Sequence, residues 1–459
     1  MKRLLATAVL LAAPILGACA ALGDDALTGE DDVRPAERTM IGRAKPYSAD
    51  KTLDSKKDAL DASQKARREA AWAAIAKVLK PVNPAEREVK EKLPAFRTWY
   101  QKDDLERMFG RLYEQHGADN RKAKKPFTMK AIDAAFDWNA NDRGSWTEQQ
   151  YFDRVKAVES NKAAAQGLGG NSRVSYSTGF ARHLLSQYSS LAKCARGETA
   201  DAPDAEPKSD TNFSTCLDEE FPKDAALIKA SWLRADFGLK VPFRPTDAAA
   251  LSQRIAAQQD EGGWGKGVTE AAPTEDEIYT VKMSDGSTFR MPALHLVTKE
   301  LREWLWITIW WSPDPDSDFG ADRPESIKKL GGPWGHYKMS VVTAYEEKDP
   351  DPRGGFEGSL GDALAATYRG VGQPTWTSNQ YIERGAHNAQ TNCIGCHQHA
   401  GTTLSSEAVL ADATKFPDHG RTKIRKNFPT DYIFAAMSAP ESLAQTIQGQ
   451  LEHYDSVDR

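Results

Sequence analysis

An apolar run near the middle of the chain limits what this protein can fold into. Residues 304–311 read Trp-Leu-Trp-Ile-Thr-Ile-Trp-Trp, and nearly every position is apolar. A strand with one face in water would alternate apolar and polar residues, so we expect this strand to be covered on both faces. Four tryptophans in eight residues could also stack on a ligand, but such a run is more often sheet core.

The segments around this run predict a β-rich middle domain. Asp285-Gly286 separates two strand-like segments, as is typical of a hairpin turn, which favours antiparallel pairing. The strand-like segments, rich in β-branched and aromatic residues, are 226–233, 277–283, 288–298, 303–311 and 337–345.

The part of the chain before these strands favours helices. Leu105, Met108, Phe109 and Leu112 follow the spacing of one helix face, and residues 181–192 predict another helix. We therefore expect an α+β multidomain protein with three parts. They are a helical region over 56–193, an antiparallel β-rich domain over 217–348 and a mainly helical domain over 349–459.

Charge and hydropathy exclude some classes of protein. The 459 residues include 60 Lys and Arg against 65 Asp and Glu, so the net charge is −5 and no basic stripe is present. We therefore expect no nucleic-acid partner. No stretch of about 18 apolar residues is present, which excludes a polytopic membrane protein. No nucleotide-binding loop, GxSxG or HExxH motif supports a hydrolase.

The N-terminus resembles a bacterial lipoprotein signal. Lys2 and Arg3 precede an apolar stretch over 4–16, which leads into Leu16-Gly17-Ala18-Cys19. The resemblance implies a signal peptide over 1–18, a lipid anchor on Cys19 and an envelope location. Ala20 in place of Asp favours the outer membrane, facing the periplasm or the cell surface. An ordinary secretory signal is the alternative. Residues 19–55 lack apolar periodicity and predict a flexible tether.

Two further cysteines predict a disulfide. Cys194 and Cys216 would close a polar, turn-rich loop over 194–216 in an exported protein, where disulfides persist. Such a bridge would contribute about 3 kcal/mol in the chain-entropy model. Two free thiols are the alternative.

The remaining cysteines form the strongest motif, Cys393-Ile394-Gly395-Cys396-His397. On a helical turn, residues three and four apart share a face, so two thiols can reach the two vinyl groups of one haem while the following histidine reaches its iron. A thioredoxin-like redox pair and a structural zinc site are the competing hypotheses. The first needs a preceding strand, and the second needs a distant second pair of ligands.

Residues 380–459 resemble a single-haem c-type cytochrome domain. The resemblance rests on residues 392–398, from Asn392 to Gln398, which match the haem-attachment motif of that family. The resemblance implies one covalent haem c held by Cys393 and Cys396, with His397 as the proximal iron ligand. That family usually supplies a downstream methionine as the second ligand, and Met437 is the only methionine after the motif. The alternative second ligands are His387, His419 and His453.

Two acidic segments are weaker candidates for metal binding. Residues 137–148 place oxygen ligands at calcium-loop spacing, although Asp142 replaces the glycine that such a loop needs, and an Asx-rich helix connection is the alternative. The candidate ligands are Asp137, Asn139, Asn141, Ser145 and Glu148. Residues 314–325 predict a solvated acidic loop that could face a basic redox partner.

Together these patterns predict a lipid-anchored cytochrome c that transfers one electron at a time. Its redox partner is not identified by the sequence, and we expect an electron carrier rather than an enzyme. The alternatives are a haem-dependent oxidoreductase with a substrate site in the middle domain, and a haem sensor or binding module.

Overall fold

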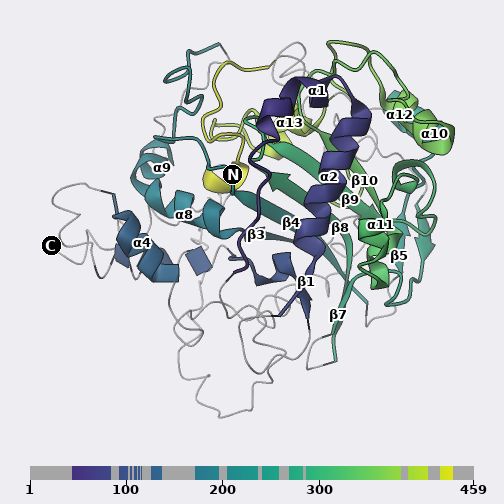
Figure 1. Ribbon diagram of the computed structural model, residues 1–459, viewed down its shortest axis with the longest axis horizontal. Helices are drawn as coiled ribbons and strands as arrows, with labels where there is room; N and C mark the ends of the chain where they lie inside the picture. The colour runs from purple at the N-terminus through teal and green to yellow at the C-terminus, as the bar shows by residue number, and fades with distance from the viewer. Residues whose placement is uncertain are drawn as a thin grey trace, which may run out of the picture. The chain divides into compact units, whose positions relative to one another are not determined.

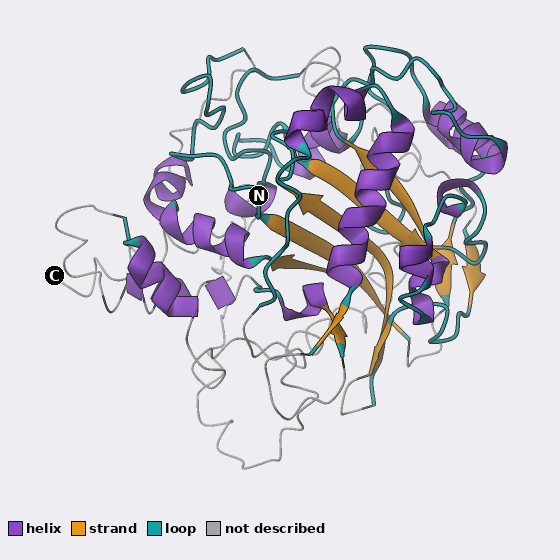
Figure 2. Cartoon of the chain, viewed as in Figure 1, coloured by secondary structure: helices purple, strands orange, loops and turns teal. Residues whose placement is uncertain are grey.

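An antiparallel sheet with helices around it forms the centre of the protein (Figures 1 and 2). The computed structural model describes residues that all lie within one compact unit. They are residues 44–83, 92–101, 104–105, 108–110, 112–113, 115, 126–136, 171–195, 204–235, 240–257, 268–282, 286–383, 391–411 and 424–437.

The main sheet has the strand order β10-β9-β8-β4-β3, and β7 pairs with β8. Every pairing is antiparallel, which confirms the α+β class and the antiparallel β-rich part. Its strands are β3 (Asn171–Tyr176), β4 (Ala226–Arg234), β7 (Thr280–Lys282), β8 (Thr288–Thr298), β9 (Leu305–Trp311) and β10 (Tyr337–Val342). Two small sheets pair β1 (Pro81–Val82) with β2 (Leu93–Pro94) and β5 (Val241–Phe243) with β6 (Thr269–Ala271).

The helices lie before, between and after these strands. In chain order they are α1 (Lys57–Asp61), α2 (Gln64–Leu79), α4 (Met129–Phe136), α8 (Thr178–Ser186), α9 (Tyr188–Ala195), α10 (Ala248–Ala257), α11 (Glu325–Lys328), α12 (Gly358–Thr367), α13 (Cys393–His397), α14 (Ser406–Ala411) and α15 (Phe434–Met437). The four residues expected on one helix face are helical and buried; they are Leu105, Met108, Phe109 and Leu112.

Strand β9 is the apolar run, and all seven of its residues are buried between β8 and β10. This confirms a strand covered on both faces. Strand β3 was missed, because Asn171-Ser172-Arg173-Val174-Ser175-Tyr176 is largely polar. It pairs with β4 at the end of the strand order, and its last residue, Tyr176, also bridges to Tyr100, so the region expected to be helical contributes a strand.

Helix α2 crosses in front of the sheet in Figure 1 and is tied to the acidic segment after β9. Arg68 is fully buried and binds both carboxylate oxygens of Asp322 at 2.6 Å. Asp318 pairs with Lys338 at 2.7 Å, and both side chains are buried. The expectation of a solvated acidic loop was therefore wrong for these residues, because buried cations on α2 and β10 neutralise them.

Part of the expected tether packs against the protein. Ala44, Tyr47 and Leu53 are buried, and the Tyr47 hydroxyl donates to Glu300 at 2.9 Å. The backbone N–H of Asp50 also donates to Glu300, at 2.6 Å. Residues 44–55 therefore belong to the folded unit.

The positions of several expectations lie outside the described residues. They are the signal peptide over 1–18, Cys19, the calcium-loop residues Asp137, Asn139, Asn141, Ser145 and Glu148, and the alternative ligands His387, His419 and His453. In the part of the chain that the structure describes, no helix is both long and apolar enough to cross a membrane.

Cys194 and Cys216 form a disulfide, with Cα atoms 5.5 Å apart. It ties α9 to the segment before β4, and the backbone N–H of Cys216 donates to the carbonyl of Pro429 at 2.9 Å. The disulfide loop is therefore also bonded to a segment that lies more than two hundred residues further along the chain.

We expect replacement of both cysteines (Cys194→Ser with Cys216→Ser) to lower the free energy of unfolding by about 3 kcal/mol, because the unfolded chain regains the freedom of a 22-residue loop. Urea denaturation of the purified chain measures this change. The wild-type chain under reducing conditions is the control and should match the variant. Equal stability of oxidised wild type and variant would contradict the prediction.

Candidate functional site

Helix α13 carries the two thiols and the histidine of the CxxCH motif, and Asn392 caps its N-terminus. The Asn392 side-chain oxygen accepts from the backbone N–H groups of Ile394 and Gly395 at 3.1 and 3.2 Å. Its amide nitrogen donates to the carbonyl of Tyr345 at 3.0 Å. One buried side chain therefore starts the helix and fixes it to the segment that follows β10.

Gly395 is required by close packing at the middle of the motif. A Cβ atom there would lie 1.7 Å from Thr391 Oγ1 and 2.8 Å from a ring carbon of Tyr345. Its backbone is ordinary helix, so the constraint is space and not conformation. The helix that carries the motif therefore packs closely against Thr391 and Tyr345 at Gly395.

The His397 ring contacts two aromatic side chains. Its centroid is 4.5 Å from Trp306 on β9 and 5.1 Å from Phe434 on α15. His397 Nδ1 lies 2.8 Å from the carbonyl oxygen of Tyr432. A carbonyl can only accept, so Nδ1 carries the proton and Nε2 keeps its lone pair. This is the arrangement of a metal-binding histidine whose second nitrogen is held by the backbone.

Burial also keeps the His397 imidazole neutral. It lowers the pKa of His397 to about 4, although the Tyr432 carbonyl opposes the shift. The neutral form is the one that can bind a metal through Nε2.

The Tyr432 carbonyl belongs to a tightly held turn over 428–433. Tyr432 stacks on Phe428 with centroids 4.2 Å apart. The Pro429 carbonyl accepts from Ser214 Oγ at 2.5 Å in addition to Cys216. Asp431 and Tyr432 have φ values of +49° and +69°, a left-handed conformation that non-glycine residues adopt only when their surroundings fix it.

The two thiols of the motif are not joined in a disulfide. Cys393 packs against the main core, whereas Cys396 lies with Val409, Leu404 and Phe434 in a small separate apolar cluster. Burial, with Glu383 next in size, holds the pKa of the Cys393 thiol well above its usual value. A thioredoxin-like pair needs the opposite shift, because its nucleophile is a thiolate.

A row of polar side chains crosses the sheet near this motif, and the sequence did not identify it. Lys229, His295, Thr308 and Ser340 are cross-strand partners on β4, β8, β9 and β10, so they share one sheet face. Trp306 lies two residues from Thr308 and therefore on the same face.

Two residues from the 376–383 segment bond to this row. Glu383 Oε1 is 3.0 Å from His295 Nε2, and the Asn379 amide donates to Thr308 Oγ1 at 2.7 Å. The signal available in the sequence was a lysine and a histidine within largely apolar strands.

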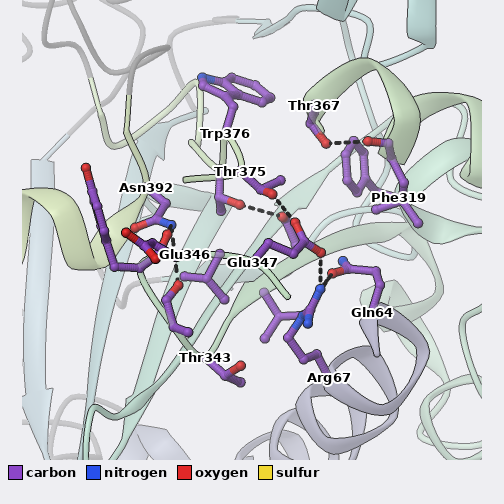
Figure 3. A pocket seen from close by; sticks show the side chains of 17 residues that line it. Gln64, Arg67, Phe319, Thr343, Glu346, Glu347, Thr367, Thr375, Trp376 and Asn392 are labelled. Carbon is purple, nitrogen blue, oxygen red and sulfur yellow. Dashed lines mark hydrogen bonds and ion pairs between the residues drawn. The ribbon is translucent and has the colours of Figure 1, made fainter. Parts of the chain in front are cut away.

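A small cavity lies beside the Asn392 cap, between α2 and the end of β10 (Figure 3). Arg67, Glu347 and Thr375 are linked along its wall, and Asn392 lines it from the motif. Its volume of about 20 Å³ has room for one water molecule and none for a haem-sized group.

The structure brings Cys393, Cys396 and His397 together on one helical turn. Met437 is the last residue of α15, three residues after Phe434, and its side chain lies outside the description. Among the described residues, no group of three or more His, Cys, Asp or Glu side chains could hold a metal ion. Comparison of the chain with protein-family models, with curated proteins and with solved structures found no match.

We expect Gly395→Ala to lower the free energy of unfolding by about 1–3 kcal/mol, because the new methyl group overlaps Thr391 and Tyr345. Thr391→Ala in the same chain should recover part of this loss. Gly335→Ala is the control and should change stability by less than about 0.5 kcal/mol, since nothing lies within 4 Å of its added Cβ. Urea denaturation measures all three, and a neutral Gly395→Ala would contradict the packing argument.

Proposed function

We propose that this protein is a c-type cytochrome that carries one covalent haem and transfers single electrons. The observation that supports it most directly is the His397 hydrogen bond: Nδ1 donates to the Tyr432 carbonyl, which leaves a neutral Nε2 for iron. The thiols that would bind the haem vinyl groups lie four residues and one residue before this histidine.

The residues present fit such a group by their chemistry. Cys393 and Cys396 are thiols with apolar neighbours, as a haem edge requires, and the imidazole is neutral and oriented. When bound, the haem supplies the one-electron chemistry. The chain's own residues attach it, hold the imidazole by the Tyr432 carbonyl, and cover the imidazole with Trp306 and Phe434.

The wider proposal is a lipid-anchored carrier in the cell envelope, with Cys19 as the lipidated residue and a redox protein as its partner. The lipobox-like residues before Cys19 support the anchor. The Cys194–Cys216 disulfide supports an oxidising compartment, which c-type haem attachment also needs.

Haem content tests the proposal directly. We expect the wild-type chain, produced with cytochrome c maturation machinery, to hold one haem per chain that stays attached on denaturation, measured as its pyridine haemochrome. The double variant Cys393→Ala with Cys396→Ala should hold none. A matched control, Cys194→Ser with Cys216→Ser, also lacks two cysteines and should keep its haem. A wild-type chain without covalent haem would refute the proposal.

Met437 is our proposed second iron ligand. We expect Met437→Ala to open the sixth coordination position, so that the oxidised spectrum becomes high-spin and the reduced form binds CO. Met129→Ala is the control, because Met129 is 46% exposed and distant in sequence from the motif. An unchanged low-spin spectrum in Met437→Ala would assign the ligand to another residue, with His387, His419 and His453 the next variants.

A further inference from the structure

The turn that holds His397 is itself held by charged residues from the sheet. Lys299 follows β8, and its Nζ lies 2.7 Å from Asp431 Oδ1. The same carboxylate oxygen accepts from Trp304 Nε1 at 3.1 Å, and Oδ2 accepts from the backbone N–H of Phe221 at 2.9 Å. Lys299 and Asp431 are 2% and 4% exposed, so water does not screen this ion pair.

The ion pair is tied to a larger cluster on the sheet side. Lys299 also donates to the carbonyl of Arg302 at 2.6 Å and lies 3.5 Å from Glu220, which pairs with Arg302 at 3.0 Å. The Lys299 ammonium lies 5.2 Å from the Trp304 ring centroid, within cation–π distance. The position of the Lys299 side chain is therefore fixed by these neighbours as well as by Asp431.

Asp431 immediately precedes the residue whose carbonyl accepts from His397. Both Asp431 and Tyr432 are left-handed, a conformation that costs about 1–2 kcal/mol per non-glycine residue. Three hydrogen bonds to the Asp431 carboxylate are available to offset this cost. The direction of the Tyr432 carbonyl thus depends on contacts made by the neighbouring side chain.

We infer that the buried Lys299–Asp431 ion pair positions the Tyr432 carbonyl on His397 Nδ1, so that residues of the sheet set the tautomer and donor strength of this histidine. Neither Lys299 nor Asp431 touches the imidazole, so both are positioning residues. The consequence for iron rests on the proposed function: a firmly bonded Nδ1–H makes the imidazole a stronger donor, which favours ferric iron and lowers the reduction potential.

The first test needs no haem. The full chain is produced without maturation machinery and labelled with ¹⁵N-histidine, and the imidazole ¹⁵N shifts of His397 report its tautomer at neutral pH. Wild type should show the Nδ1–H form alone. The double variant Lys299→Met with Asp431→Asn should show a mixture of both tautomers. It removes no net charge, and Asn tolerates the left-handed conformation at 431.

Two further variants keep the test decisive. Trp304→Phe removes the 3.1 Å bond to Asp431 and keeps an aromatic ring beside Lys299, so it should give a smaller change in the same direction, even if the double variant folds poorly. The control is Lys426→Gln with Glu206→Gln, which removes an exposed 2.7 Å ion pair that Lys426 of the same C-terminal segment makes with Glu206 of the disulfide loop. It should leave the His397 tautomer unchanged. An Nδ1–H form retained in both the double variant and Trp304→Phe would overturn the inference.

The second readout uses the haem-loaded chain. The double variant should hold one haem per chain, have a higher reduction potential than wild type, and exchange its His397 Nδ1 proton about tenfold faster, as expected for loss of one hydrogen bond. A loaded double variant with the wild-type potential and exchange rate would overturn the inference while leaving the cytochrome proposal intact. A chain that never takes up haem would refute the cytochrome proposal, and the tautomer measurement would still decide the role of the ion pair.

Discussion

The hydrogen bond from His397 Nδ1 to the Tyr432 carbonyl, 2.8 Å long, is the interaction on which the account of this site depends. It joins the CxxCH helix to a turn 35 residues later and decides which imidazole nitrogen is available. The carbonyl that accepts this bond belongs to a turn in which both Asp431 and Tyr432 are left-handed. Partial burial then lowers the pKa of His397 to about 4, so the imidazole is neutral at neutral pH.

The site also depends on the sheet, because the C-terminal segment and the sheet share one hydrophobic core. Ile394 of the motif, and Phe428 and Tyr432 of the turn, are buried in the same cluster as the residues of β9. Trp306 of β9 covers one side of the His397 ring. The residues around the motif are therefore built onto the β-rich part of the chain, which gives that part a role in shaping the site.

Local sequence signals predicted much of the fold. The expected strand 288–298 is β8, and the apolar run 304–311 contains β9. Both could be predicted because a run of apolar or β-branched residues can be recognised from consecutive positions in the sequence. Strand β3 could not be predicted in this way, since its largely polar residues form a strand through pairing with β4 and a bridge to Tyr100, both distant in the sequence. The packing of residues 44–55 likewise depends on Glu300, about 250 residues away.

The residues of the candidate site likewise fall into those that the sequence predicted and those that it did not. Cys393, Cys396 and His397 were predicted because their chemistry lies within five consecutive residues. Trp306, Lys299, Asp431 and the Tyr432 carbonyl were not, because tertiary structure alone brings them to the motif. The ion pairs Arg68–Asp322 and Lys338–Asp318 could not be predicted either. No local sequence pattern shows that these two aspartates have buried cationic partners.

The intact mass of a denatured Cys19→Ser chain, which cannot be lipidated, tests the central claim most directly when the chain is exported by a cleavable secretory signal from cells that attach c-type haem. We expect a mass higher than that of the polypeptide by one haem, with the added mass located on the peptide that contains Cys393 and Cys396. A chain with the polypeptide mass alone, or with the added mass on another peptide, would contradict it.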